Sequence, residues 1–584
     1  MATKTSKRNK KQSISHEATE PVIANTDMPI KRELGTVFFI GCFIGAILFI
    51  ILYGYKILNF TYVDWIYAKQ HSDMFVHQIG FEFFRNDTWR FPLGSYLNYS
   101  YPFGSSVVYT DSIPLFAIIF KLIDFILPKS FQYFGLWGIL CFMLNGGISA
   151  LIIRRYSSNL IAVFIGSVFV IYSTNVIWRM FAHTSLAGQW IILLAILVWC
   201  YKDYFKDLKT RLLIWILLAT LSATIHAYLA LMLLIMMCGF IIDDYLEYKS
   251  IKRIGTIFGC SVLSAGLVFW SLGGLVVQEV STGGLGYYSM NINALFNPQG
   301  WSLFLKDMKM ATAGQYEGFQ YLGLGIIVMI PVVLFNLISE SKLLRGKYEF
   351  SVIFVCCVAL VLSLSPVITF SDKILFNIHS VLPETFIKLW SIFRASGRLF
   401  WPAYYILIFY LIIKIINMAK TKTAATIFLS LCLTIQIIDI SPQLINTMTF
   451  YRQDVVLSTT LNSDFWTDVG QKFNHIEYLS SDTSQYEKLA LLAVKNDMTL
   501  NNGYFARKQD QKINERIGKL INNINTGQLS KDSIYIFNAD DPTGMINGKA
   551  NDYLILNVDE YKICVAKDTL DITKYSQYLA DNSI

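Results

Sequence analysis

Long apolar runs recur along this chain of 584 residues, and they restrict its fold more than any other feature. Hydrophobic residues make up 54% of the sequence and charged residues only 15%, whereas an average soluble domain carries about 25% charge. Runs of roughly 17–25 apolar residues can cross a bilayer core, where only helices and closed barrels satisfy their backbone hydrogen bonds. The sequence therefore predicts a mainly α fold, a polytopic transmembrane helical bundle of about 11 spans. The predicted spans are residues 36–56, 132–152, 160–177, 184–201, 211–227, 228–244, 253–275, 321–338, 350–369, 399–416 and 423–441.

Basic residues predict the orientation of these spans. Lys and Arg mark cytoplasmic connections, and residues 1–35 form a basic tail in front of the first span. We expect this tail to be cytoplasmic and the first span to be uncleaved rather than a signal peptide. Further basic connections lie near Arg154, Lys206, Lys252, Arg345 and Lys420. These inner residues account for much of the net charge of +8, so no nucleic-acid partner is expected.

Parity from a cytoplasmic N-terminus decides which connections lie outside. Arg154 and Arg155 lie inside only if the apolar stretch 113–128 does not cross the membrane. That stretch is short and contains Lys121 and Asp124, so we expect an interfacial or re-entrant helix; if it crosses instead, the two arginines lie outside. With the first assignment, the outer side collects the large first loop (residues 57–131), residues 178–183, 276–320 and 370–398, and the chain from 442 onwards.

The composition changes after residue 441. Short apolar runs alternate there with helix-like stretches, and about 140 residues are enough to bury a separate core. We therefore expect residues 442–584 to form an extracytoplasmic α/β domain that follows a transmembrane domain of residues 36–441. Residues 540–544 (Asp-Asp-Pro-Thr-Gly) are typical of a turn, with a cation site as the alternative. Cys564 is the one cysteine of this domain, so no disulfide can form within it.

The first loop is rich in carboxylates and aromatic rings, and loops on a rigid scaffold often carry function. Asp73 precedes a mixed segment with apolar residues at helical spacing. A carboxylate that is partly desolvated beside a membrane can take a proton from a sugar hydroxyl, so Asp73 is the first candidate for a general base. Asp111 is the second candidate. Helix capping is the alternative role for both carboxylates.

Four arginines are candidates for binding an anion. Arg85 and Arg90 flank Trp89 in the first loop, and Arg394 and Arg398 lie four residues apart before a predicted span. Residues four apart share one face of a helix, and paired planar guanidinium groups suit a phosphate or pyrophosphate. Positioning by lipid headgroups is the alternative.

Polar residues inside apolar sequence indicate a cavity or a polar bundle interior. His183, Gln189 and His226 are of this kind, and such groups are costly in lipid. A packing role is the alternative for His226. The sequence contains no CxxC and no HExxH, so it predicts no dedicated metal motif.

Several motifs can be compared together. They are DMFVHQIG (73–80), FR (84–85), WRFPLG (89–94), YTDSIP (109–114), HTSLAGQW (183–190), YYSMN (287–291), NPQGWS (297–302), GQYEGFQYLG (314–323), RASGR (394–398) and WP (401–402). As a set, they resemble the GT-C superfamily of polytopic glycosyltransferases and, within it, an uncharacterised bacterial membrane-protein family, domain of unknown function 6311. The resemblance covers residues 36–440 and does not include the domain that follows.

The resemblance implies a sugar donor carried on a polyprenyl phosphate and a reaction on the outer side of the bacterial cytoplasmic (inner) membrane. An acidic residue of the first outer loop serves such enzymes as base or positions the acceptor, and Asp73 matches that place best. Some branches of the superfamily use paired acidic residues with a metal, and Asp73, Asp111 and Glu317 could form such a set. We expect no metal and no other cofactor, while a divalent cation stays open.

The implied activity is that of a polyprenyl-phosphate-sugar-dependent glycosyltransferase acting on a surface glycan such as O-antigen or teichoic acid. Asp73, or Asp111 as second candidate, deprotonates the glycan acceptor in this interpretation. The donor phosphate is bound by Arg85, Arg90, Arg394 and Arg398. The residues expected to contact sugar or acceptor are His183, Gln189, Trp89, Tyr288, Asn291, Gln315 and Glu317. For the aromatic rings, an interfacial belt against the membrane lipids is the alternative.

Two other classes compete with an enzyme. A transporter or flippase of lipid-linked sugars predicts inverted internal repeats with broken helices at corresponding positions, and the sequence shows no such symmetry. A sugar-binding or scaffold protein would place its critical groups in residues 442–584 rather than in the first loop.

Overall fold

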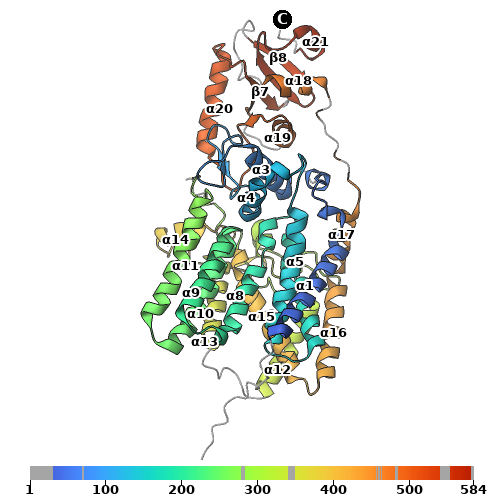
Figure 1. Cartoon of the computed structure of the whole chain (residues 1–584), viewed down its shortest axis with the longest axis vertical. Helices are drawn as coiled ribbons and strands as arrows, with labels where there is room; N and C mark the ends of the chain where they lie inside the picture. The colour runs from blue at the N-terminus through green and yellow to red at the C-terminus, as the bar shows by residue number, and fades with distance from the viewer. Residues whose placement is uncertain are drawn as a thin grey trace, which may run out of the picture.

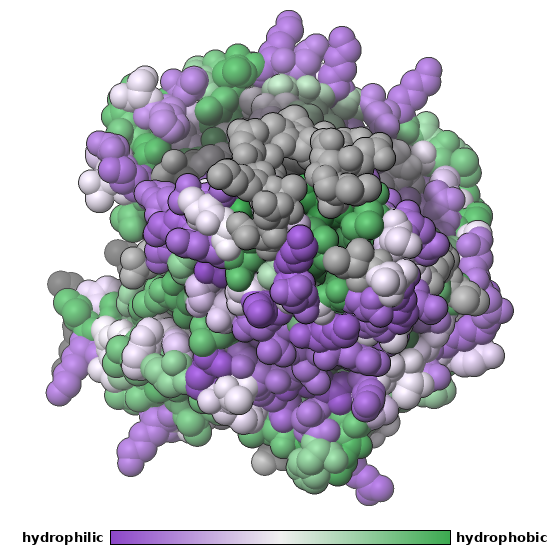
Figure 2. Space-filling model, turned by 90° about the horizontal axis from the view of Figure 1, so that it is seen from above, coloured by the Kyte–Doolittle hydropathy of each residue, from purple (hydrophilic) through white to green (hydrophobic). Residues whose placement is uncertain are grey.

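The computed structural model describes residues 31–68, 71–277, 283–339, 349–455, 457, 461, 463–480, 485–538 and 553–579. A bundle of long helices carries a smaller domain at one end, and α3 and α4 lie between the two (Figure 1). We call the smaller domain, within residues 463–579, the tail domain, and the bundle end beside it the tail end. Seen from this end, much of the surface is hydrophilic (Figure 2). The bundle helices, by contrast, expose large apolar side chains such as Phe39, Leu263 and Phe335.

Each predicted span contains a helix. The bundle helices are α1 (Lys31–Tyr53), α5 (Phe134–Arg154), α6 (Leu160–Ile171), α7 (Thr174–Arg179), α8 (Trp190–Cys200), α9 (Leu208–Ala223), α10 (Ala227–Tyr248), α11 (Ile251–Ser271), α12 (Leu324–Ser339), α13 (Glu349–Leu364), α15 (Trp401–Met418) and α16 (Lys422–Asp439). Within the described residues, seven helical segments are long and apolar enough to cross a membrane. The mainly helical fold of a membrane protein is confirmed, whereas the predicted number of spans is not.

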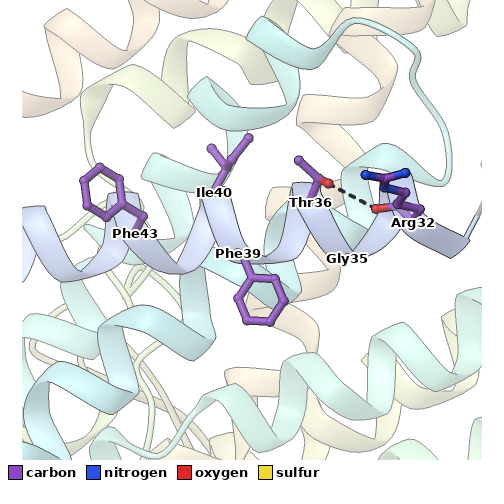
Figure 3. Close-up of a pocket in the computed structure, with 6 residues that line it drawn as sticks. All are labelled: Arg32, Gly35, Thr36, Phe39, Ile40 and Phe43. Atoms are coloured by element: carbon purple, nitrogen blue, oxygen red, sulfur yellow. Dashed lines mark hydrogen bonds between the residues drawn. The ribbon is translucent and has the colours of Figure 1, made fainter.

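Helix α1 packs closely on α5 because glycines let the two backbones meet. A Cβ atom on Gly45 would lie 2.2 Å from the carbonyl oxygen of Phe142, and one on Gly41 would lie 2.6 Å from that of Gly146. Small residues allow membrane helices to approach in this way. Another part of the α1 surface holds a shallow cavity of about 510 Å³ (Figure 3), lined by Arg32, Gly35, Thr36, Phe39, Ile40 and Phe43.

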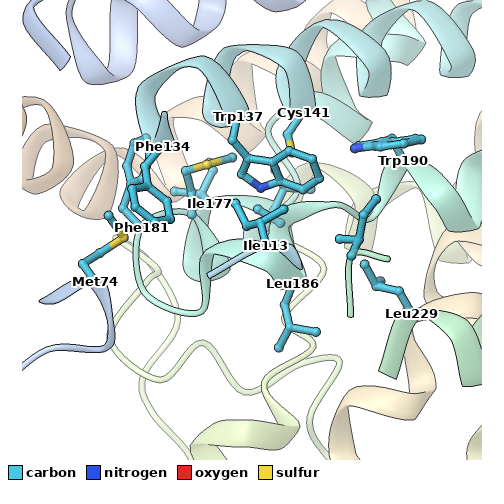
Figure 4. Packing of buried hydrophobic residues seen from close by; sticks show 14 of the residues in the cluster. Met74, Ile113, Phe134, Trp137, Cys141, Ile177, Phe181, Leu186, Trp190 and Leu229 are labelled. Carbon is cyan, nitrogen blue, oxygen red and sulfur yellow. The ribbon is translucent and has the colours of Figure 1, made fainter. Parts of the chain in front are cut away.

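The apolar core of the bundle continues into the first loop. Trp137 of α5, Trp190 of α8 and Leu229 of α10 belong to one buried cluster (Figure 4). Met74 and Ile113, which both come from the first loop, are members of the same cluster. Buried side chains therefore anchor this loop in the bundle.

The first loop is built from short elements. They are η1 (Lys56–Leu58), α2 (Asp64–Tyr67), α3 (Asp73–Asn86), β1 (Ser95–Tyr96), β2 (Ser105–Ser106), α4 (Pro114–Leu122) and η2 (Asp124–Ile126). Helix α4 has nine residues, which at 1.5 Å per residue is about 14 Å, less than half of a bilayer core of about 30 Å. Helix α4 is thus too short to cross the membrane, which agrees with the expected interfacial or re-entrant helix.

The bundle end away from the tail domain holds ion pairs, and we call it the basic end. Arg154 lies 2.6 Å from Glu33, at the start of α1. Both Arg211 and Arg253 pair with Asp244, whose side chain is fully buried. The basic connections that the sequence predicts to be cytoplasmic are therefore partly neutralised by acidic partners within the protein.

The remaining connections contain η3 (Thr184–Ala187), η4 (Lys202–Tyr204), η5 (Ala313–Gly318), β3 (Val367–Phe370), β4 (Lys373–Asn377), α14 (Glu384–Ser391) and η6 (Ser396–Phe400). Strands β3 and β4 form an antiparallel hairpin. Turns η5 and η6 lie side by side, since a Cβ atom on Gly397 would be 2.5 Å from the Cα atom of Gly318. This glycine contact brings residues of two distant connections together.

The tail domain is α/β, as predicted. After α17 (Ser441–Arg452), its elements are α18 (Asp464–Lys472), β5 (His475–Tyr478), α19 (Tyr486–Lys495), β6 (Thr499–Leu500), α20 (Asp510–Asn525), β7 (Ser533–Asn538), β8 (Tyr553–Val558), β9 (Tyr561–Ala566), α21 (Ile572–Tyr575) and η8 (Ser576–Tyr578). The sheet order is β6-β5-β7-β9-β8, with β6, β5 and β7 parallel and the other pairs antiparallel. The predicted turn at residues 540–544 lies outside the described residues.

The edge strand β6 joins the tail domain to the first loop. Leu500 donates its backbone N–H to the carbonyl oxygen of Asn98 at 2.9 Å, and Tyr101 donates to the carbonyl oxygen of Leu500 at 3.1 Å. Tyr99 lies opposite Leu500 as a parallel bridge. The first loop thus forms an isolated bridge on the edge of the sheet, and edge strands commonly bind other segments in this way.

Candidate functional site

Charged side chains from separate parts of the chain meet at the tail end of the bundle. They are Asp73 at the start of α3, Asp111 before α4, His183 before η3, Glu317 in η5 and Arg398 in η6. We call these five residues the carboxylate cluster. All five were candidates from the sequence for catalysis, phosphate binding or sugar contacts, in separate connections, and the fold brings them together.

Asp73 does not cap helix α3. The capping residue of α3 is Ser72, whose side chain accepts the backbone N–H of Phe75. The carboxylate of Asp73 keeps 34% of its side-chain surface exposed and lies 3.2 Å from Nδ1 of His183. Burial of the rest of the group raises the pKa of Asp73 above its ordinary value. A carboxylate of raised pKa that substrate can still reach is suited to general-base work.

Asp111 is not a cap either. Helix α4 begins after Ile113 without a side-chain capping bond, and Asp111 itself has a positive φ of 53°. Its carboxylate accepts a hydrogen bond from the hydroxyl of Ser185 and lies 3.6 Å from Nε2 of His226. Asp111 is therefore a second carboxylate of the cluster, held by groups of the bundle.

His226 faces this carboxylate, which decides against a plain packing role. Its Nδ1 accepts the backbone N–H of Tyr228 at 3.0 Å, so the ring proton of the neutral form sits on Nε2, toward Asp111. In its neutral form the ring can therefore donate a hydrogen bond from Nε2.

Glu317 links two arginines. Arg398 donates to both of its carboxylate oxygens at 2.8 Å, and a side-chain nitrogen of Arg179 lies 2.7 Å from one of them. Burial alone would raise the pKa of Glu317, but the two guanidinium groups hold it well below its ordinary value. The expected hydrogen bonds from Glu317 to a sugar are therefore replaced by ion pairs inside the protein.

His183 connects the two carboxylates. Its Nδ1 faces Asp73 and its Nε2 lies 3.6 Å from Glu317. Burial lowers the pKa of His183 well below its ordinary value, so this ring is neutral. The sequence singled out His183 as a polar residue in apolar surroundings. The structure places its ring between the carboxylates of Asp73 and Glu317.

Arg85 and Arg90 are engaged within the first loop. Arg85 pairs with Asp124 and donates to the carbonyl oxygens of Pro128 and Lys129, and Arg90 lies 2.6 Å from Asp87. These local partners neutralise both arginines, which removes the basis for a joint phosphate site with Arg394 and Arg398. Trp89, also predicted to contact sugar, packs its ring edge-on against Phe84, within the first loop.

Arg394 and Arg398 do not share a helix face. Turn η6 begins only at Ser396, and Ala395 has the non-helical dihedrals φ −83° and ψ 63°. Arg398 turns inward to Glu317, whereas Arg394 stays exposed, with its guanidinium carbon 5.8 Å from the centre of the Tyr288 ring. One arginine of this predicted pair is thus structural, and the other stands on the surface beside an aromatic ring.

The predicted sugar ligands Gln189, Asn291 and Gln315 bond within the protein. Gln189 is fully buried and accepts from the hydroxyl of Tyr405. Asn291 donates to Gln315 at 3.1 Å, and Gln315 donates to Thr369 of β3 at 2.7 Å. These amides hold connections together, so their polar atoms are used by the fold.

Arg179 is a member of this charged network that the sequence analysis did not single out. It stands at the end of α7 with a side chain that is only 2% exposed, and its partner Glu317 is far away in the sequence. A lone arginine in an apolar stretch was the available signal, because such charges in membrane segments are rare and pair with partners.

The described residues contain no cluster of side chains typical of a metal site. Across residues 31–579, wherever the structure describes them, no group of three or more His, Cys, Asp or Glu side chains could hold a metal ion. The three carboxylates named from the sequence face basic or hydroxyl partners: Asp73 faces His183, Asp111 faces His226 and Ser185, and Glu317 faces arginines. The expectation of no metal stays a prediction. The cavity on α1 is formed by residues 32–43 and involves none of these groups.

Comparison with known proteins gives a family match and partial similarities to solved structures. Among curated proteins, none matches this chain. A crystal structure of the Archaeoglobus fulgidus oligosaccharyltransferase, tethered with an acceptor peptide containing the NVT sequon via a disulfide bond, is similar with a TM-score of 0.41 and 9% identity over 87% of this chain and 69% of that chain. A second crystal structure of that enzyme, in complex with Zn and sulfate, is similar with a TM-score of 0.36 and 10% identity over 90% of this chain and 73% of that chain.

The family match covers both parts of the molecule. The model described as Domain of unknown function (DUF6311) matches residues 42–441, which include the bundle and the whole carboxylate cluster. The DUF6311 C-terminal domain matches residues 465–566, within the tail domain. On the strength of these two matches, the chain belongs to the DUF6311 family.

Proposed function

We propose that this protein is a glycosyltransferase that moves a sugar from a polyprenyl-phosphate-linked donor to an extracytoplasmic surface glycan, such as O-antigen or teichoic acid. The observation that carries the proposal is the carboxylate of Asp73. It is partly exposed, has a raised pKa, and lies 3.2 Å from His183 at the tail end of a membrane bundle. Seen from the side of the tail domain, the molecule presents a largely hydrophilic face (Figure 2), as access for a glycan acceptor requires.

Asp73 acts as the general base in the proposed reaction. It takes the proton of an acceptor hydroxyl while that oxygen forms a bond to the anomeric carbon of the donor sugar. The bond between this carbon and the phosphate oxygen breaks, and its electron pair leaves with the polyprenyl phosphate. His183 holds the Asp73 carboxylate in place, and the partial burial of Asp73 makes it more basic than an exposed aspartate.

Positive charge for the leaving phosphate comes first from Arg394, in the outer connection of residues 370–398. Arg394 is exposed and free of the buried ion pairs that hold Arg398. Arg398 and Arg179 add a fixed positive field, because Glu317 keeps both guanidinium groups from turning away. Charge placed in advance where negative charge develops lowers the barrier of such a step.

The proposal places the protein in the cytoplasmic (inner) membrane of a bacterium. The N-terminus lies in the cytoplasm together with the basic end, and the tail domain lies outside, as the distribution of Lys and Arg favours. The donor's polyprenyl chain remains in the lipid while its sugar reaches the cluster. No cofactor is assigned, since the carboxylates of the cluster already have basic or hydroxyl partners.

The test uses the full-length protein in lipid nanodiscs. It is incubated with a panel of polyprenyl-phosphate-linked hexoses and N-acetylhexosamines, together with lipid-linked O-antigen and teichoic acid acceptors, and products are followed by mass spectrometry. Asp73→Asn is expected to lower kcat about 100-fold or more, which is the usual contribution of a general base. Asp64→Asn is the matched control, because Asp64 is likewise the first residue of a helix in the first loop.

The possible outcomes distinguish the transfer activity, the role of Asp73 and transport. Transfer by the wild type and the control, with little from Asp73→Asn, supports both the activity and the base. Equal transfer by all three proteins overturns the role of Asp73. Absence of transfer from every donor, together with movement of labelled lipid-linked sugar across the membrane of proteoliposomes, replaces the proposal with transport.

A further inference from the structure

A loop of the tail domain contacts segments next to the carboxylate cluster. Residues 501–507, which we call the bridging loop, follow directly on the edge strand β6. The backbone N–H of Ala506 donates to the carbonyl oxygen of Tyr109 at 2.9 Å, two residues before Asp111. Arg507 donates to the carbonyl oxygen of Ile392 at 2.9 Å, two residues before Arg394. The bridging loop is therefore fixed to two of the connections that deliver the cluster, those of Asp111 and Arg398.

Buried neighbours hold the centre of this loop in one position. A Cβ atom on Gly503 would lie 2.2 Å from the hydroxyl oxygen of Tyr99, so only glycine allows this close approach. The ring of Phe505 is buried and packs 4.5 Å from the ring of Tyr99, centre to centre. Both flanking residues of Tyr504 are thus fastened to the first loop.

Tyr504 itself is 48% exposed. Burial of the remaining surface raises the pKa of its hydroxyl, and the negative charge of Asp73 raises it further, while Arg394 lowers it. The phenol therefore stands close to both residues to which the proposed reaction assigns proton transfer and phosphate binding. An aromatic side chain that stays exposed between two fixed, buried neighbours is available to a ligand.

We propose that Tyr504 forms the acceptor subsite by stacking its ring on a sugar of the incoming glycan beside Asp73. The proposal rests on the proposed function for the reaction that follows, whereas the binding of glycan is a property of the loop itself. The tail domain is in this view part of the active site and determines which acceptor is used.

The ligand is a glycan rather than the donor lipid because of where the ring comes from. Tyr504 belongs to the tail domain, at the hydrophilic end of the molecule (Figure 2), whereas the polyprenyl chain reaches the cluster from the bundle side. Exposed tyrosine rings from another connection, Tyr287 and Tyr316, lie near Tyr288 and add further flat surfaces. Rings of this kind bind the apolar faces of sugars while the hydroxyls remain solvated.

The experiment separates acceptor binding from the chemical step. Full-length Tyr504→Ala, Tyr504→Phe and Tyr55→Ala are compared in the transfer assay, because Tyr55 is an exposed tyrosine, 70% accessible, that follows α1. Tyr504→Ala is expected to raise the KM for the acceptor about tenfold with kcat changed less than twofold, the size of one aromatic contact. Tyr504→Phe keeps the ring and is expected to stay within about twofold of the wild type.

A second measurement does not depend on transfer. The same proteins are applied to an array of bacterial surface glycans, and slow hydrolysis of the donor by water is measured without any acceptor. Loss of array binding by Tyr504→Ala, with unchanged donor hydrolysis, supports the subsite. Unchanged acceptor KM and array binding overturn it while leaving the proposed function intact. Array binding that depends on Tyr504, in a protein that transfers no sugar, leaves the subsite standing and overturns the proposed function instead.

Discussion

Arg398 donates two parallel hydrogen bonds of 2.8 Å to the carboxylate of Glu317, and both side chains are buried. Paired, planar geometry of this type gives the strongest hydrogen bonds between side chains. Turns η5 and η6 meet through Gly318 and Gly397 just where this pair forms. The pair therefore fixes two distant connections of the chain against each other.

Glu317→Gln is expected to destabilise the protein strongly. The substitution leaves Arg398 and Arg179 buried without their common counter-charge, and breaking a buried pair on one side costs about 3–5 kcal/mol. Thermal unfolding in detergent measures the effect. Glu560→Gln is the control, since Glu560 pairs with Lys488 at a partly exposed site, where such pairs contribute only about 0–1 kcal/mol. Equal losses for the two variants contradict the role given to Glu317.

The contribution of Glu317 should depend on pH in one direction. Its pKa is lowered well below 4.5 in the folded protein, so its stabilisation is fully present above pH 4.5 and is lost as the pH falls through the lowered value. The difference in melting temperature between wild type and Glu317→Gln is expected to be constant from pH 7 to pH 5 and to shrink in stronger acid. A difference that grows on acidification would falsify this assignment.

The rate of transfer should fall in acid because Asp73 must be ionised to accept a proton. Burial raises its pKa above 3.8 and the charge of Asp111 raises it further, so the acid limb of the kcat profile lies above the usual range of an aspartate. Asp111→Asn removes one of these causes and is expected to move the limb to lower pH. Asp203→Asn, at the basic end, serves as the control. If the acid limb of the kcat profile lies at the same pH in Asp111→Asn as in the wild type, Asp73 is not the titrating base.

Arg394 and Arg85 should respond differently to the same substitution. Arg394 is exposed beside Tyr288, so Arg394→Met is expected to raise the KM for the donor about tenfold, a typical loss for one charged hydrogen bond. Arg85 is already satisfied by Asp124 and two carbonyl groups, so Arg85→Met is expected to lower the melting temperature and leave the donor KM unchanged. Steady-state kinetics with a saturating acceptor distinguish the two, and the reverse pattern would return Arg85 to the phosphate site.

Leu500→Pro should detach the tail domain from the first loop. Proline has no N–H for the carbonyl oxygen of Asn98 and does not fit a paired strand. Hydrogen exchange at residues 98–101 is expected to accelerate about tenfold or more, which corresponds to the loss of one backbone hydrogen bond. Leu500→Ala, which keeps the N–H, is the control. Equal protection in the two variants would show that the tail domain is held by other contacts.

The bundle could be predicted from the sequence because apolar runs carry a direct signal for helices in membranes. Asp73 and Asp111 could also be named as candidates from the sequence, because they stand in a polar loop between apolar segments. Their neighbours could not be predicted, since the contacts of Asp73 with His183 and of Glu317 with Arg179 join residues more than 100 positions apart. Only the folded chain shows such pairs.

The structure differs from two assumptions behind the predicted phosphate site. The pairing of Arg394 with Arg398 assumed a continuous helix, but the dihedrals of Ala395 are not helical and η6 starts after it. The phosphate role of Arg85 assumed a free guanidinium, but Asp124, which belongs to the next helical turn of the same loop, neutralises it. Amides such as Gln315 were expected to bind sugar and instead fasten β3 to η5, a use that a sequence pattern does not distinguish from ligand binding.

The strand pairing between Asn98 and Leu500 has a consequence for biosynthesis. The two partners are separated by about 400 residues, and a chain emerging from the ribosome folds its N-terminal parts first. Until the chain has been made as far as Leu500, the paired segment of the first loop lacks its partner. A chain that stops after Arg452 keeps every bundle helix and yet lacks the bridging loop, so residues made well after the bundle decide whether the proposed acceptor subsite can form.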